Sequence, residues 1–128
     1  MNNSRKSVLY VDDEFLNLEL FKINFRDSYN VVTANSGMKG LEILEKENIG
    51  VVISDLKMPG MSGLEFIEHI KTKTPNKVCI LLSAYLETDA MQTAETKRLI
   101  FQCMSKPWKK ADLQKVIETA ITEFEKSL

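Results

Sequence analysis

The sequence has few of the residues that build cross-linked or zinc-based scaffolds. It contains only two cysteines, Cys79 and Cys103, and one histidine in 128 residues. These residues cannot form a four-ligand structural zinc site without help from carboxylates. Each cysteine lies in an apolar run, which predicts two buried, reduced thiols. A chain of this length buries enough surface to fold without a disulfide or a structural metal.

The sequence also lacks an excess of charge of either sign and any long apolar run. Its formal net charge of −1 provides no general attraction to nucleic acid or to anionic membranes. No run approaches the roughly 20 apolar residues that span a bilayer. Residues 1–6 contain no apolar signal-peptide core. We therefore expect a cytoplasmic protein with no membrane attachment and no direct nucleic-acid binding. No repeat or linker divides the chain, so residues 1–128 are predicted to form a single domain.

Five short apolar runs rich in β-branched residues alternate with longer segments of helical character. Four of the runs are continuous, as expected of parallel strands that are covered on both faces. They are Ser7–Val11, Val31–Ala34, Val51–Ser54, Val78–Leu82 and Ile100–Met104. The pattern predicts an α/β fold, a (βα)5 doubly wound parallel sheet with helices on both faces.

The helical segments differ in how clearly they are marked. Ala111–Glu125 carries an apolar stripe at helical spacing, whereas Glu87–Arg98 is polar with weak periodicity. Phe15–Phe25 is ambiguous, because its leucines alternate as in a strand although its length favours a helix. Two further helices are predicted around Leu41–Leu44 and Gly63–Ile70.

Polar groups follow four of the five predicted strands. In open parallel sheets, ligands bind outside the carboxyl ends of the strands, where the strand order reverses. The groups at those ends are Asp12, Asp13 and Glu14, then Asp55, Ser83 and Lys106. Two carboxylates about 5 Å apart repel by about 3 kcal/mol at an effective dielectric constant near 20. A hard divalent cation such as Mg²⁺ would offset that repulsion.

These groups together favour phosphoryl transfer to a carboxylate. A carboxylate can attack phosphorus and form an acyl phosphate. The metal would neutralise charge on the transferred group, and catalysis of this kind is mainly positioning and electrostatics. Ser83 would donate its hydroxyl and Lys106 would bring a positive charge to the phosphate oxygens. Asp55 is the predicted acceptor.

Four motifs in order and spacing resemble those of the response-regulator receiver domain. They are Leu9-Tyr10-Val11-Asp12-Asp13-Glu14, the segment 54–63 from Ser54 to Gly63, Leu82-Ser83-Ala84, and Ser105-Lys106-Pro107-Trp108. The resemblance extends from about Lys6 to Glu125, the expected core of the domain. It implies a flavodoxin-like three-layer sandwich with strand order 2-1-3-4-5.

The resemblance also implies a role for each matching residue. Asp55 matches the phospho-acceptor, Ser83 the hydroxyl that contacts the phosphoryl group, and Lys106 the lysine that pairs with it. The implied Mg²⁺ ligands are Asp12, acting chiefly through water, Asp13, Asp55 and the backbone carbonyl of Lys57. The Lys106–Pro107 peptide bond is typically cis in this family, and Pro59, Gly60 and Gly63 match the turn before the third helix.

By the same resemblance, the chain is a signalling switch rather than an enzyme, although it assists its own phosphorylation and dephosphorylation. The phosphoryl group would come from a sensor histidine kinase or a phosphotransfer protein of a two-component phosphorelay. The implied output face combines the fourth helix, the fifth strand and the fifth helix. It would contact a downstream protein, and receivers often dimerise there.

Two departures from the family pattern lead to hypotheses. Cys103 stands where receivers carry a Tyr or Phe that changes rotamer on activation. The simpler interpretation is that this protein has a smaller side chain at that position. The alternative hypothesis is that Phe101, two residues earlier and on the same strand face, takes over part of the role. Lys57 and Tyr85 flank the reaction centre and are predicted to slow hydrolysis of the aspartyl phosphate. The one histidine, His69, is predicted to be a helix surface residue.

Three alternative functions remain at this point. A degenerate receiver used only for docking would not accept phosphate. A Mg²⁺-dependent phosphatase with an aspartate nucleophile would want a second Asp two residues after the first, where this chain has Lys57. An FMN-binding protein on the same architecture would need a phosphate loop where Asp12 and Asp13 would repel the phosphate.

Overall fold

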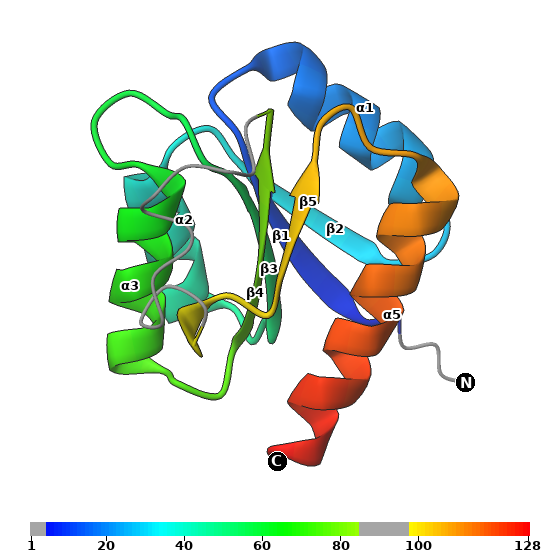
Figure 1. The fold of residues 1–128 in the computed structure, drawn as a ribbon. Helices are drawn as coiled ribbons and strands as arrows, with labels where there is room; N and C mark the ends of the chain where they lie inside the picture. Colours follow the sequence, from blue (N-terminus) through cyan, green and yellow to red (C-terminus); the bar gives the residue numbers. More distant parts are fainter. Residues whose placement is uncertain (1–4, 85–97) are drawn as a thin grey trace.

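The computed structural model describes residues 5–84 and 98–128, whose five parallel strands form one sheet in the order β2-β1-β3-β4-β5. Helices α1 and α5 cover one face of the sheet, and α2 and α3 cover the other (Figure 1). The elements are β1 (Ser7–Val11), α1 (Phe15–Phe25), β2 (Asn30–Ala34), α2 (Gly37–Lys46), β3 (Val51–Asp55), α3 (Gly63–Lys73), β4 (Val78–Ser83), β5 (Gln102–Ser105) and α5 (Lys110–Lys126). This arrangement confirms the predicted fold class and strand order. Of the predicted helix Glu87–Arg98, all but Arg98 lies outside the described residues.

Alternate residues of the central strands pack into two separate cores. In β1, Val8 and Tyr10 join the α1/α5 side, whereas Leu9 and Val11 join the α2/α3 side. All four side chains are buried. A strand covered on both faces needs apolar residues at every position, which explains the continuous runs in the sequence.

Helix α1 resolves the ambiguity in the alternating leucines. Leu18, Phe21 and Phe25 point into the core at helical spacing, while Leu16 and Leu20 are exposed. The alternation arose because apolar residues occupy both faces of this helix. Across residues 5–84 and 98–128, none of the helices combines the length and the apolar content that crossing a bilayer requires.

The loop after Asp55 enters α3 through a well-defined start. The Ser62 hydroxyl accepts the amide of Glu65 at 3.2 Å, and the Glu65 carboxylate accepts the amide of Ser62 at 3.0 Å. This capping box satisfies two amides at the helix start that have no partner within the helix. Gly60, in the loop before it, has φ +76°, a backbone conformation that glycine adopts without steric cost.

Gly63 brings the start of α3 close to the backbone of Asp55. A Cβ added at Gly63 would lie 2.0 Å from the Asp55 carbonyl oxygen, and the Gly63 amide donates to the Leu56 carbonyl at 2.8 Å. The loop between β3 and α3 therefore closes only with glycine at this position.

We expect Gly63→Ala to lower the free energy of unfolding by about 1–3 kcal/mol or more, because backbone must move to admit the methyl group. Denaturant unfolding measures the change. Gly60→Asn is the control, since asparagine tolerates a positive φ and Gly60 has open space around it. Equal losses in the two variants would contradict the close approach at Gly63.

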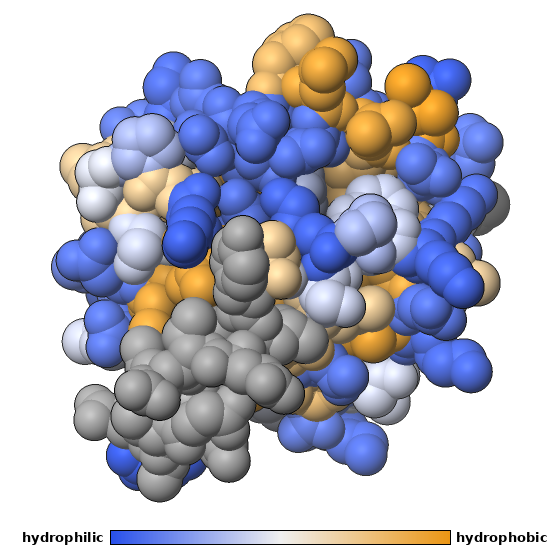
Figure 2. Space-filling model, turned by 45° about the horizontal axis from the view of Figure 1, so that its top comes forward, coloured by the Kyte–Doolittle hydropathy of each residue, from blue (hydrophilic) through white to orange (hydrophobic). Residues whose placement is uncertain are grey.

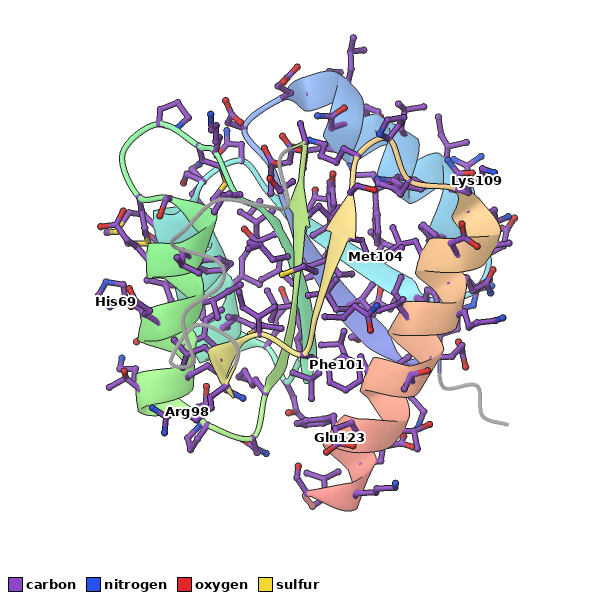
Figure 3. All side chains as sticks on the ribbon, in the orientation of Figure 1. His69, Arg98, Phe101, Met104, Lys109 and Glu123 are labelled. Carbon is purple, nitrogen blue, oxygen red and sulfur yellow. The ribbon has the colours of Figure 1, made fainter. Side chains whose placement is uncertain are left out.

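The hypothesis that Phe101 replaces the missing aromatic at Cys103 is wrong. Both residues were expected on one face of a strand, but β5 begins only at Gln102 and the chain bends at Phe101. Phe101 packs with Met104 on the α1/α5 side, as Figure 3 shows, whereas Cys103 packs on the α2/α3 side. The Phe101 ring therefore cannot take the path that an aromatic side chain at position 103 would use.

Candidate functional site

Three carboxylates converge at the carboxyl edge of the sheet. Strands β1 and β3 are neighbours with Val11 beside Ser54, so Asp12 and Asp55 follow side by side. One ligand atom from each of Asp12, Asp13 and Asp55 lies within 4.8 Å of the others. Asp12 and Asp55 are buried, with 0% and 9% of their surface exposed, and Asp13 is exposed. The structure thus brings together three of the four acidic residues that the sequence singled out. The fourth, Glu14, is exposed and contacts the cluster through its backbone amide, which donates to Asp12 Oδ1.

Lys106 reaches into this cluster from the end of β5. Its Nζ lies 3.1 Å from Asp55 Oδ1 and 3.5 Å from Asp12 Oδ2. Burial alone would lower the pKa of Lys106, but Asp12 and Asp55 outweigh it and raise the pKa above its ordinary value. The ammonium group is therefore firmly charged. The Lys106–Pro107 peptide bond is cis, as the family resemblance implied.

Asp55 is less easily ionised than an ordinary aspartate. Burial raises the pKa of its carboxyl group, and the neighbouring Asp12 charge adds to the effect, although Lys106 acts in the opposite direction. Burial is the largest of these influences, so the pKa of Asp55 lies above its ordinary value. A further positive charge near Asp55 would favour the carboxylate form that attacks phosphorus.

Ser83 is the last residue of β4, and Lys106 directly follows the neighbouring strand β5. Ser83 is buried and pairs with Ser105 in the register of β4 and β5, and the Lys106 amide donates to the Ser83 carbonyl at 3.0 Å. Lys57 lies exposed two residues after Asp55. Tyr85 lies outside the described residues, so the hypothesis about phosphate lifetime stays a prediction.

Asp12 is held by donors that sequence reasoning missed. The Tyr10 hydroxyl donates to Asp12 Oδ2 at 2.9 Å, and Asn17 Nδ2 donates to the same oxygen at 3.1 Å. The Glu14 amide donates to Asp12 Oδ1 at 3.0 Å. The available signal was spacing: residues i and i+2 of an extended chain share a face, which aligns Tyr10 with Asp12.

The other residues noted in the sequence, the two cysteines, His69 and Trp108, lie outside the carboxylate cluster. Cys79 is fully buried and burial raises its pKa to about 12, whereas Cys103 is only half-buried, so the prediction of buried thiols holds fully for Cys79 alone. His69 is exposed and points outward from α3 (Figure 3), as predicted. Trp108 packs against Phe21 and Phe25, with ring centroids 6.2 and 5.7 Å apart.

The donor set fits a hard divalent cation. Its ligand atoms are carboxylate oxygens on fixed strand ends, with one exposed carboxylate, Asp13, open to solvent. Mg²⁺ is usually held by one or two carboxylates together with waters and phosphate oxygens. Asp13 and Asp55 could supply the carboxylates, and Asp12 could act from its buried position behind them.

Sequence comparison places these residues in a known family. The profile described as the response regulator receiver domain matches residues 8–118. The transcriptional regulatory protein GlrR of Escherichia coli K12 is 34% identical over 125 residues, covering 96% of this chain and 28% of GlrR. The first curated relatives are much longer, since the chain spans only 22% to 28% of their length.

Solved structures show the same fold. A response regulator receiver domain protein from Clostridium thermocellum superposes with a TM-score of 0.88 at 32% identity, covering 96% of this chain and 99% of that one. The response regulator TrrA from Thermotoga maritima, solved in complex with Mg²⁺-BeF, superposes with a TM-score of 0.80 at 29% identity, covering 90% and 98% of the two chains.

Proposed function

This chain belongs to the response regulator receiver domain family, and from that premise we propose that it is a switch controlled by Mg²⁺-dependent phosphorylation of Asp55. As a member, it is the receiver domain of a two-component response regulator. The observation that carries the proposal is the contact between Lys106 Nζ and Asp55 Oδ1 at 3.1 Å within the cluster of three carboxylates.

The proposed step is a displacement at phosphorus. An Asp55 carboxylate oxygen attacks the phosphorus of a phosphohistidine, the P–N bond breaks, and the imidazole leaves with its electron pair. Lys106 and the Ser83 hydroxyl would receive the phosphoryl oxygens, because both lie at strand ends next to Asp55. Asp13, Asp55 and the Lys57 carbonyl would hold Mg²⁺, with Asp12 acting through water. The bound ion would neutralise charge on the transferred group.

The alternatives fit the arrangement less well. A docking-only receiver has no need of Lys106 placed between Asp12 and Asp55. A phosphatase would turn over many small phosphate esters. An acceptor is instead modified once, and hydrolysis then slowly removes its phosphoryl group. The proposed switch therefore has no separate substrate, although it assists its own modification.

Incubation with acetyl phosphate tests the proposal without a protein donor. We expect the full chain to gain one phosphoryl group in the presence of Mg²⁺ and none in the presence of a chelator, as measured by intact-protein mass spectrometry. Lack of modification under both conditions would favour the docking-only alternative. Continuous release of inorganic phosphate at a high rate would favour the phosphatase.

A protein donor needs a surface next to the site, and α1 offers one. Phe15, Leu16, Leu20 and Ile23 expose between 53% and 73% of their surface. The helix begins directly after Asp13 and Glu14, so this apolar stripe starts at the rim of the carboxylate cluster. Figure 2 shows hydrophobic surface gathered at the top of the view, where α1 lies. We propose that a histidine kinase or phosphotransfer protein docks there.

We expect the double substitution Leu16→Ser and Leu20→Ser to slow phosphoryl transfer from the cognate kinase by about 10-fold or more, because losing apolar anchors at the centre of an interface typically costs over 1 kcal/mol. Labelling by acetyl phosphate should not change. Met38→Ser on α2 is the matched control, since Met38 is 60% exposed on the other side of the sheet. If labelling by acetyl phosphate also became slower, the substitutions would have impaired the phosphorylation site and not the docking of the kinase.

We also propose an output face that includes β5 and α5. Strand β5 and helix α5 would contribute to the surface that contacts a downstream protein or a second copy of the chain. The remainder of that face falls within 85–97, outside the described residues. With Cys103 at the aromatic position and Phe101 on the other side of β5, this receiver would pass its signal without the usual aromatic rotamer change.

A further inference from the structure

The Asp12 carboxylate accepts more hydrogen bonds from protein groups than an indirect metal ligand requires. It is 0% exposed, and its Oδ2 accepts from Tyr10 and Asn17 while lying 3.5 Å from Lys106 Nζ. Each carboxylate oxygen has about two lone-pair sites. Oδ2 is therefore filled by protein donors, whereas Oδ1, which accepts the Glu14 amide, keeps acceptor capacity on its side.

The hydroxyl of Tyr10 is held at a fixed place. Tyr10 is fully buried in β1, and its ring stacks on Phe21 with centroids 4.3 Å apart and an interplanar angle of 3°. Phe21 in turn contacts Trp108 edge-on. Because a buried ring in such a stack has little rotational freedom, its hydroxyl position is set by the core and not by solvent.

We propose that Tyr10 and Asn17 are positioning residues that orient the Asp12 carboxylate toward the Mg²⁺ and phosphoryl site. The inference rests on the proposed function of that site. Donors behind a metal-site carboxylate fix its orientation, and their loss typically lowers metal affinity 10- to 100-fold. Tyr10 contributes from the sheet and Asn17 from the first turn of α1, so two separate elements fix the same oxygen.

A purely structural role makes a different prediction. If the Tyr10–Asp12 hydrogen bond served only to satisfy two buried polar groups, its removal would lower stability and leave metal affinity unchanged. The two roles are separable because stability can be measured in a chelator, while affinity is measured on the folded protein well below its melting temperature.

The test uses Tyr10→Phe, which keeps the ring and its stack on Phe21, and Asn17→Ala. The matched control is Tyr29→Phe, which also removes the hydroxyl of a buried tyrosine, one that donates to Glu118 on α5 in a part-buried contact. For each full-length variant, calorimetry gives the Kd for Mg²⁺ and denaturant unfolding in a chelator gives the stability. We expect Tyr10→Phe and Asn17→Ala to raise the Kd about 10-fold each, and Tyr29→Phe to leave it unchanged.

A wild-type Kd in Tyr10→Phe would overturn the inference and leave the proposed function intact. If the wild-type protein itself bound no Mg²⁺, the proposed function and this inference would both fail. Should Tyr10→Phe not fold, Asn17→Ala decides the matter, because Asn17 is only partly buried and an unchanged Kd there would equally overturn the inference.

Discussion

Asp55→Asn is expected to abolish phosphoryl acceptance from every donor, since an amide oxygen is a poor nucleophile and cannot form the acyl phosphate. Radiolabelled acetyl phosphate and a phosphorylated kinase should both leave the variant unlabelled. The effect is the largest we expect, because no other carboxylate combines burial with a 3.1 Å contact to Lys106 in the described part of the chain.

The loss of label should not come from loss of structure. Asparagine has almost the same shape as aspartate, and its introduction removes a buried charge whose pKa burial has raised. In a chelator, Asp55→Asn should therefore be at least as stable as the wild-type protein near neutral pH. Full labelling of this variant would instead assign the acceptor to another residue.

Asp13→Asn is expected to raise the Kd for Mg²⁺ by at least about 10-fold, because it removes the exposed carboxylate of the cluster. In the wild-type protein, Mg²⁺ at 100 times its Kd should add about 2.7 kcal/mol to the free energy of unfolding. At the same concentration, a 10-fold weaker variant should gain only about 1.4 kcal/mol. Thermal or denaturant unfolding with and without Mg²⁺ measures both values.

Comparing the stability of Asp12→Asn with that of Asp13→Asn in a chelator tests the difference in burial between the two residues. Asp13 is exposed, so its replacement should change the stability in a chelator by about 0.5 kcal/mol at most. Asp12 is buried among the Tyr10, Asn17 and Glu14 donors, and an asparagine there would place an amide group against them or against Lys106. Equal stabilities of the two variants in a chelator would contradict the difference in burial that the structure shows.

Much of the architecture follows from patterns that the sequence displays directly. Two-sided burial explains why residues 51–53 and 78–82, which make up most of β3 and β4, are continuous apolar runs. In parallel sheets the carboxyl ends of the strands meet at one edge. Asp12, Asp55 and Lys106 could therefore be predicted to come together before any distance was known, and the strand order agreed with the family resemblance.

Other features depend on tertiary packing that no local pattern encodes. The side of β5 on which Phe101 lies depends on a bend one residue before the strand. The helix Phe15–Phe25 carries apolar residues on its outer face, which hides its periodicity. The donors to Asp12 depend on how β1 and α1 pack, so the sequence marked Asp12 but not the residues that hold it.

The central claim is that Asp55 forms an acyl phosphate, and borohydride trapping tests it most directly. Borohydride reduces an aspartyl phosphate to homoserine, which peptide sequencing by mass spectrometry locates. After treatment with acetyl phosphate and Mg²⁺, we predict homoserine at position 55, and its absence when a chelator replaces the metal. Homoserine at a different position, or a phosphorylated protein with unmodified Asp55 after reduction, would contradict the account.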